Sequence, residues 1–235
     1  MNQQVLLVLS GGFGTRLKSV VSEVPKPLAP VNDHPFLYYQ VENWTSQGLR
    51  KFIFLLHNQS ELIIDFLDSE KEGILKDCEV SWIVEPEPLG TGGSVAHCVK
   101  QLNISGSFLL TNADTWLGSG IAEISQSDAP AMAVIHVDNS GRYGSVQMAG
   151  EYITSFHEKS NTTTSGWINA GLCLLEAESF EIGEQKVYSL EQTIFPELAH
   201  NGKLKAIKLS TDFIDIGIPE DYFRFIELIN SQATH

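Results

Sequence analysis

Short apolar runs rich in β-branched residues alternate with segments of helical periodicity along the first half of the chain. This alternation is typical of a parallel sheet wound with helices, since buried strands are apolar throughout and each covering helix has one apolar face. We therefore expect an α/β fold with helices on both faces of the sheet. The predicted strands are Val5–Leu9, Phe52–Leu56, Val80–Val84 and Phe108–Thr111, and the predicted helices are Phe36–Gln47 and Glu61–Ser69.

A different pattern begins at about Pro130, where turn residues separate the predicted strands. Such spacing favours antiparallel or mixed pairing in this part of the sheet. The whole chain is therefore predicted to form a Rossmann-like, three-layer fold with a mixed, mainly parallel sheet. The later strands are predicted at Met132–Val137, Ser145–Met148, Tyr152–Phe156, Trp167–Leu175 and Lys205–Leu209, and helices are predicted at Ser189–Ala199 and from Pro219 onward.

The formal net charge of −14 argues against binding to nucleic acid or to an anionic membrane, because both need a concentrated basic face. The apolar run Val5–Leu9 is too short to span a membrane and follows no basic segment, so no signal peptide or membrane span is predicted. Cys78, Cys98 and Cys173 lack the spacing of a metal or redox site and are expected to be free thiols. We expect a cytoplasmic protein. The sequence leaves open whether the chain forms a homo-oligomer.

A glycine-rich segment, Ser10–Arg16, directly follows the first predicted strand. Its three glycines let main-chain amides approach an anion without interference from a Cβ, and Arg16 and Lys26 would supply positive charge. The Walker pattern does not fit, because no Gly-Lys pair occurs at the required spacing. The dinucleotide fingerprint does not fit either, because Leu17 stands where its third glycine should be. A phosphate-binding loop of another kind is therefore predicted.

The chain resembles the sugar-phosphate nucleotidyltransferases in several ordered segments that extend along its whole length. The family joins a sugar 1-phosphate to a nucleoside triphosphate and releases pyrophosphate, so the resemblance implies this activity and the family's GT-A-like fold. It also implies a single domain, residues 1–235, with a nucleotide-binding half (1–115) and a sugar-phosphate-binding half (116–235). The segments are Gly11–Arg16, Pro25–Val31, Glu85–Gly93, Thr111–Thr115, Glu158–Lys159, Asn169–Gly171 and Phe213–Glu220.

Within the family, the compact length and two of these segments favour GTP and D-glycero-α-D-manno-heptose 1-phosphate as substrates. Mannose, glucose and N-acetylmuramic acid 1-phosphates stay open as alternatives, with GTP, dTTP or UTP as the nucleotide. An alternative of a different class is a catalytically silent regulatory subunit that binds a nucleotide-sugar. An NAD-dependent oxidoreductase is disfavoured, because the dinucleotide fingerprint is missing.

The resemblance implies that Asp114 and Asp215 bind Mg²⁺. Asp114 follows a predicted strand end, where ligands of open α/β sheets collect, and Asp215 lies in a second strand-to-helix turn. Two carboxylates from distant segments make a hard oxygen site suited to this ion. Arg16, Lys26, Asp114 and Lys159 are the predicted catalytic residues.

The other family positions carry over residue by residue. Glu85 matches a position that faces the nucleobase, and an ionised carboxylate there could accept both N1–H and N2–H of guanine. Lys159 is expected to hold the sugar phosphate. The expected nucleotide-binding residues are Leu9, Gly11, Gly12, Gly14, Thr15, Arg16, Lys26, Glu85, Leu89, Gly90, Thr91 and Asn112, and the expected sugar-phosphate-binding residues are Tyr143, Gly144, Glu158, Lys159, Asn169 and Asp215.

Overall fold

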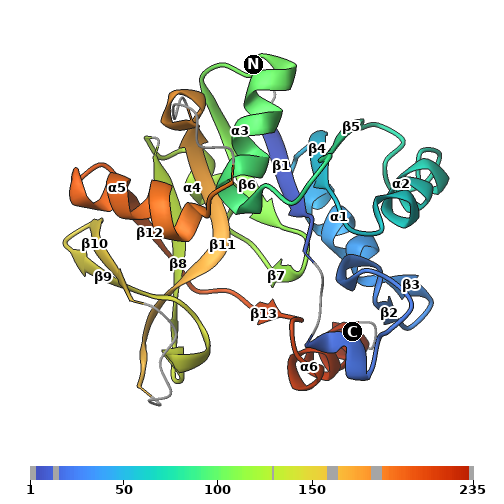
Figure 1. Cartoon of the computed structure of the whole chain (residues 1–235). Helices are drawn as coiled ribbons and strands as arrows, with labels where there is room; N and C mark the ends of the chain where they lie inside the picture. The colour runs from blue at the N-terminus through green and yellow to red at the C-terminus, as the bar shows by residue number, and fades with distance from the viewer. Residues whose placement is uncertain (1–3, 13–15, 129, 158–163, 181–186, 233–235) are drawn as a thin grey trace.

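The computed structural model describes residues 4–12, 16–128, 130–157, 164–180 and 187–232 (Figure 1). The main sheet comprises β1 (Val5–Ser10), β4 (Lys51–Leu56), β5 (Glu79–Val84), β6 (Ser107–Asn112), β8 (Ala131–Val137), β9 (Ser145–Ala149), β10 (Tyr152–His157), β11 (Gly166–Glu176) and β12 (Lys205–Leu209). The helices are α1 (Phe36–Ser46), α2 (Ser60–Ser69), α3 (Gly90–Leu102), α4 (Ile121–Ser125), α5 (Phe195–His200) and α6 (Pro219–Gln232). Short helical turns are η1 (Leu17–Ser19), η2 (Lys26–Leu28), η3 (Ser140–Arg142), η4 (Ala177–Phe180) and the π-helical η5 (Leu190–Ile194), and the small two-stranded pairs are β2 (Pro30–Val31) with β3 (His34–Pro35) and β7 (Thr115–Leu117) with β13 (Phe213–Asp215).

The main sheet has the strand order β5-β4-β1-β6-β11-β8-β12-β10-β9. The first four strands are parallel, as the alternating pattern predicts. The mainly parallel arrangement predicted for the whole sheet needs correction, because β11 runs antiparallel to both its neighbours and β10 runs antiparallel to β12 and β9. Short connections such as the one between β9 and β10 permit only antiparallel pairing. The sheet is therefore mixed, with a four-stranded parallel part from the first half of the chain and one further parallel pair, β8 and β12, in the second half.

Side chains that alternate along the strands divide the core into two layers. Leu6 and Val8 of β1 pack in one cluster with α1, α2 and α4, while Leu7 packs in the other with α3, η5 and α5. Because successive strand residues point to opposite faces, both faces of the sheet are covered by helices. The predicted three-layer arrangement is therefore confirmed. Figure 1 shows α2 near one end of the sheet and the β9–β10 hairpin near the other.

A third, smaller cluster packs α6 against the β7–β13 pair. Trp116 of β7 contacts Phe225 of α6 with 5.1 Å between ring centroids, and Ile214 of β13 is buried beside them. The buried Gln40 of α1 donates its Nε2–H to the carbonyl of Thr115 at 2.8 Å, which ties β7 to the helical layer. These contacts hold β7, which begins directly after Asp114, and β13, which ends at Asp215.

The structure also bears on the expectations about membrane spans and cysteines. Within the part that the structure describes, no helix has the length and apolar character needed to cross a membrane. Cys78, Cys98 and Cys173 are free, as expected. Burial raises the pKa of the Cys98 thiol to about 12, so this side chain acts as a core residue and not as a reactive thiolate.

Candidate active site

Asp114 and Asp215 are neighbours in space although they lie in distant parts of the sequence. Asp114 lies in the turn between β6 and β7, and Asp215 ends β13, which pairs with β7 so that Asp215 lies opposite Thr115. The amide of Ile216 donates to the main-chain carbonyl of Asp114 at 3.1 Å. The structure therefore brings together the two carboxylates that the sequence predicts to act as a pair.

The electrostatics of this pair show two carboxylates held close to cations. Lys26 donates from Nζ to Oδ2 of Asp114 at 3.0 Å, and the amide of Gly217 donates to Oδ1 of Asp215 at 2.8 Å. Burial raises the pKa of Asp215, and the charge of Asp114 raises it further. The Gly217 hydrogen bond and the charges of Lys26 and Arg16 act in the opposite direction. A divalent cation between the two carboxylates would remove their mutual repulsion.

One cavity, of about 530 Å³, opens between Asp114 and the glycine-rich segment, and we call it the glycine-loop cavity. It lies beyond the carboxyl ends of β1 and β6, where ligands of open α/β sheets bind. Arg16 and Lys26 supply its positive charge. Its lining comprises Leu9, Ser10, Gly11, Gly12, Arg16, Lys26, Pro27, Glu85, Pro88, Gly90, Thr91, Ser94, Asn112, Ala113, Asp114 and Glu191.

Glu85 is a buried carboxylate in the wall of the glycine-loop cavity, with 7% of its surface exposed. Its Oε2 accepts a hydrogen bond from the amide of Leu89 at 3.1 Å. Its Oε1 lies 3.9 Å from the position that a Cβ would occupy on Gly11. Leu89 itself is buried and contributes its amide to the orientation of Glu85, whereas the sequence predicts a nucleotide contact at this position.

Packing within the protein explains the glycines at the start of α3, independently of any ligand. Gly90 has a φ of +72°, and a Cβ there would lie 2.6 Å from the carbonyl oxygen of Tyr188. A Cβ on Gly92 would lie 2.3 Å from the Tyr188 ring, and the amides of Gly92 and Gly93 both donate to the Tyr188 carbonyl. The segment around Tyr188 therefore packs against the first turn of α3 and caps it.

A second cavity, of about 700 Å³, lies beside Asp215 and is called the β11 cavity. Asn169 lies at the bulge of β11, and its Oδ1 accepts a hydrogen bond from the amide of Gly171 at 2.9 Å. This contact leaves the side-chain amide N–H groups of Asn169 for the cavity. The lining comprises Asn112, Thr115, Tyr143, Gly144, Phe156, Asn169, Gly171, Ser189, Glu191, Gln192, Pro196, Phe213 and Asp215.

Glu191 and Asn112 line both cavities, so the two spaces meet at these residues. Oε2 of Glu191 accepts hydrogen bonds from the hydroxyl of Thr91 at 3.0 Å and from that of Ser189 at 2.6 Å. The sequence gives no signal for this role of Glu191, because its partner Thr91 lies in a distant segment. Gly14, Thr15, Glu158 and Lys159 lie outside the described residues.

Comparisons with known proteins agree with this geometry. The sequence pattern of the nucleotidyl transferase family matches residues 5–232. The chain belongs to this family. The resemblance predicted from the sequence segments is thereby confirmed.

Individual relatives are similar over most of the chain. D-glycero-alpha-D-manno-heptose 1-phosphate guanylyltransferase of Campylobacter jejuni is 31% identical over 94% of this chain and 97% of its own length. Mannose-1-phosphate guanyltransferase 2 of Candida glabrata is 30% identical over 92% of this chain, which spans 62% of that protein. The crystal structure of HddC from Yersinia pseudotuberculosis complexed with GMP-PN has a TM-score of 0.82 and 33% identity, covering 96% of this chain and 99% of that one.

Proposed function

We propose that this enzyme joins GTP to D-glycero-α-D-manno-heptose 1-phosphate, forming a GDP-heptose and releasing pyrophosphate. The observation that carries the proposal is that two cavities meet at Asn112 and Glu191, with Asp114 lining one cavity and the neighbouring Asp215 lining the other. GTP is assigned to the glycine-loop cavity and the sugar 1-phosphate to the β11 cavity. This assignment follows the predicted division into residues 1–115 and 116–235, except that Glu191 also lines the glycine-loop cavity and that Asn112 and Thr115 line the β11 cavity. The cytoplasm is the proposed location.

In the proposed reaction, a phosphate oxygen of the sugar 1-phosphate attacks the α-phosphorus of GTP. A new P–O bond forms, the bond from the α-phosphorus to the bridging oxygen breaks, and pyrophosphate leaves with the electron pair. Arg16 and Lys26 hold the polyphosphate in the glycine-loop cavity and neutralise the leaving group. The attacking phosphate already carries negative charge, so no general base is required. Positioning and charge supply the catalysis.

Mg²⁺ is proposed to bind to Asp114 and Asp215, where it would neutralise charge on the reacting phosphates. The raised pKa of Asp215, which burial and the charge of Asp114 both cause, fits a pair of carboxylates arranged for a cation. Among the described residues, no group of three or more His, Cys, Asp or Glu side chains is placed to hold a metal. The phosphates of the two substrates are therefore the proposed source of the remaining ligands.

Glu85 is proposed to select guanine. Its buried carboxylate has one oxygen engaged by Leu89, so Oε1 and the second lone pair of Oε2 are available for N1–H and N2–H. Uracil and thymine present a carbonyl acceptor beside their single N–H, and a carboxylate repels this acceptor.

Gly11, Gly12, Gly14 and Thr15 are proposed to bind the phosphates.

Lys159 and Glu158 are proposed to hold the phosphate and a hydroxyl of the sugar substrate, together with Asn169. Replacement of Lys159 with Ala is expected to raise the KM for the sugar 1-phosphate by about tenfold or more, since a charge-assisted contact is lost. The KM for GTP should stay close to the wild-type value. Equal KM values for the sugar 1-phosphate in variant and wild type would contradict this assignment.

The test of the proposed function is pyrophosphate release over a matrix of four nucleoside triphosphates and a panel of sugar 1-phosphates. The panel should contain the heptose, mannose, glucose and N-acetylmuramic acid compounds. We expect the highest kcat/KM with GTP and the heptose. Preference for mannose 1-phosphate would favour the activity named for the Candida glabrata relative. Nucleotide-sugar binding without any turnover would instead indicate a regulatory subunit.

A further inference from the structure

Asp221 is a buried charged residue that the proposed reaction does not use. It lies in the first turn of α6, within a few residues of Asp215, and only 3% of its surface is exposed. Its Oδ2 accepts a hydrogen bond from Arg142, and its Oδ1 lies 3.1 Å from Nη1 of Arg224. One buried carboxylate therefore holds two guanidinium groups from different elements, η3 and α6.

Arg142, the first partner of Asp221, contacts a residue in the lining of the β11 cavity. Arg142 directly precedes Tyr143 and Gly144, and its guanidinium lies 5.5 Å from the centroid of the Tyr143 ring. Burial raises the pKa of the Tyr143 phenol, and the charge of Asp221 and then that of Asp215 raise it further. Tyr143 is therefore in contact with the Asp221–Arg142 pair and lines the β11 cavity together with Asp215.

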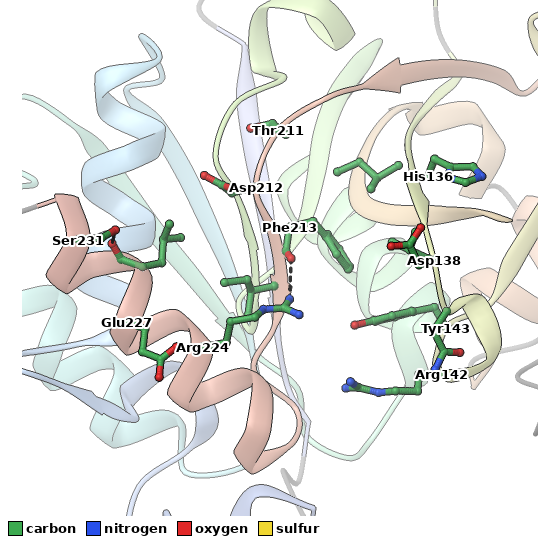
Figure 2. Close-up of a pocket in the computed structure, with 15 residues that line it drawn as sticks. His136, Asp138, Arg142, Tyr143, Thr211, Asp212, Phe213, Arg224, Glu227 and Ser231 are labelled. Carbon is green, nitrogen blue, oxygen red and sulfur yellow. Dashed lines mark hydrogen bonds between the residues drawn. The ribbon is translucent and has the colours of Figure 1, made fainter. Parts of the chain in front are cut away.

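Arg224, the second partner of Asp221, contacts another residue in the lining of the same cavity. Arg224 donates from Nη2 to the main-chain carbonyl of Phe213 at 2.9 Å, as the dashed line in Figure 2 shows. Phe213 lies two residues before Asp215 on β13 and lines the β11 cavity. Asp221 is thus linked through one arginine to Tyr143 and through the other to Phe213.

Tyr143 and Phe213 together form a partition that is open on both sides. Their rings meet edge to face with 5.4 Å between centroids. Both residues also line a separate cavity of about 720 Å³ bordered by α6, the α6 cavity, in which Figure 2 shows them. Phe213 packs against the core on part of its surface, but a wall with open space on each side is held less closely than a fully buried side chain. The ion pairs of Asp221 add a second constraint.

We propose that Asp221 is a positioning residue that fixes the Tyr143–Phe213 partition, and thereby the site of the sugar 1-phosphate, through Arg142 and Arg224. This inference rests on the proposed function, because it takes the β11 cavity as the sugar site. The glycine-loop cavity has none of these five residues in its lining, within the described part of the chain. Loss of the network should therefore affect the two substrates unequally.

The test compares KM and kcat for both substrates in Asp221→Asn and Arg142→Met. Each variant is expected to raise the KM for the sugar 1-phosphate about tenfold, since small misplacement of a binding wall weakens the fit to the substrate. The KM for GTP should stay unchanged. Glu220→Gln is the matched control, because Glu220 is the exposed acidic neighbour of Asp221. Arg142 has 41% of its side chain exposed, and in Arg142→Met the buried Asp221 still keeps Arg224 as a cationic partner.

The double variant separates a positioning role from general destabilisation. Because Arg142 acts through Asp221, adding Arg142→Met to Asp221→Asn is expected to cause no further rise in the KM for the sugar 1-phosphate. Equal increases in both KM values, fully additive effects, or an unchanged KM in Arg142→Met would overturn the inference. A wild-type protein without turnover on the whole substrate panel would contradict the proposed function itself.

Discussion

The two cavities are built in different ways, although each has one carboxylate of the Asp114–Asp215 pair in its lining. The glycine-loop cavity lies at the carboxyl ends of parallel strands, and its lining is largely from one continuous half of the chain. The β11 cavity collects residues from β7, β11, β13 and η5, which are distant in sequence and pair in mixed directions. The first depends on local loop geometry, while the second depends on long-range contacts that hold separate walls together.

This difference indicates how each half can change. A cavity formed by main-chain groups at strand ends tolerates few changes in backbone geometry, so its ligand class is constrained by the fold. A cavity formed by side chains from many elements can change its ligand through single substitutions. We therefore expect nucleotide chemistry to be the fixed part of the activity and sugar choice to be the variable part.

The largest expected effect is at Asp114, the carboxylate in the glycine-loop cavity that is paired with Asp215. Asp114→Asn should lower kcat by about 10² or more, because a group that stabilises transition-state charge is lost. The fold should persist, since the Asp114 side chain is 31% exposed and the replacement is isosteric. The measurement is pyrophosphate release at saturating substrates, with the melting temperature recorded in parallel. Asp212→Asn, an exposed position in the α6 cavity, is the control, and near-normal turnover of Asp114→Asn would contradict the metal role.

Base selection should depend on the glycine-loop cavity alone. Glu85→Gln is expected to reduce the preference for GTP over UTP by about tenfold, because one charge-assisted acceptor for guanine is replaced by an N–H donor. The ratio of kcat/KM values for the two nucleotides measures this change. The KM for the sugar 1-phosphate should not move. Glu87→Gln, which alters an exposed neighbour, should leave the ratio intact, and an unchanged ratio in Glu85→Gln would remove Glu85 from base recognition.

Glu191 offers a way to test whether the cavities are coupled. Its carboxylate holds the hydroxyls of Thr91 and Ser189 and lines both cavities. Glu191→Gln should therefore raise both KM values by about fivefold, since neutral hydrogen bonds replace charge-assisted ones. Initial rates over a grid of both substrates give the two values, and the exposed Glu197→Gln serves as control. A rise for only one substrate would assign Glu191 to that cavity.

The smallest effect concerns stability without metal. Burial first, and then the charge of Asp114, raises the folded-state pKa of Asp215 above its unfolded value, so its ionised form destabilises the folded protein at neutral pH. This cost is absent below the unfolded pKa and develops as pH rises through the folded pKa. Asp215→Asn is therefore expected to melt at a higher temperature than wild type at neutral pH in EDTA, with the difference shrinking in acid. A lower melting temperature at neutral pH would show that Asp215 stabilises the metal-free fold.

Much of the fold could be predicted from periodicity. The strands β1, β4, β5 and β6 and the apolar stripe of α1, with Leu37, Val41 and Trp44 buried, occur where the patterns place them. Helix α3 was not predicted, because three glycines in its first turn oppose helix formation and only the distant Tyr188 explains them. The predicted helix Glu61–Ser69 has an apolar face that includes Leu62, Ile63 and Leu67, of which Ile63 and Leu67 are buried and Leu62 is 38% exposed.

In the candidate site, too, the residues whose roles depend on distant contacts could not be predicted from the sequence. The aspartate pair was predictable because each residue lies in a recognisable segment, and the structure then places the two segments side by side. Glu191 and Asp221 were not predictable, because their roles depend on Thr91, Arg142 and other partners far away in sequence. Three-residue strands such as β7 and β13 have too little periodicity to detect. Local sequence patterns were therefore sufficient to predict the candidate reacting residues. The residues that form the cavity walls could be identified only in the structure.

The central claim is that Asp114 and Asp215 bind one divalent cation where the two cavities meet. The direct test is a crystal structure with Mn²⁺, a non-hydrolysable GTP analogue and a sugar 1-phosphate, read through the anomalous signal of manganese. We predict a peak between the two carboxylates, with the nucleotide in the glycine-loop cavity and the sugar in the β11 cavity. A manganese peak that contacts neither carboxylate, or a nucleotide bound outside the glycine-loop cavity, would contradict the account.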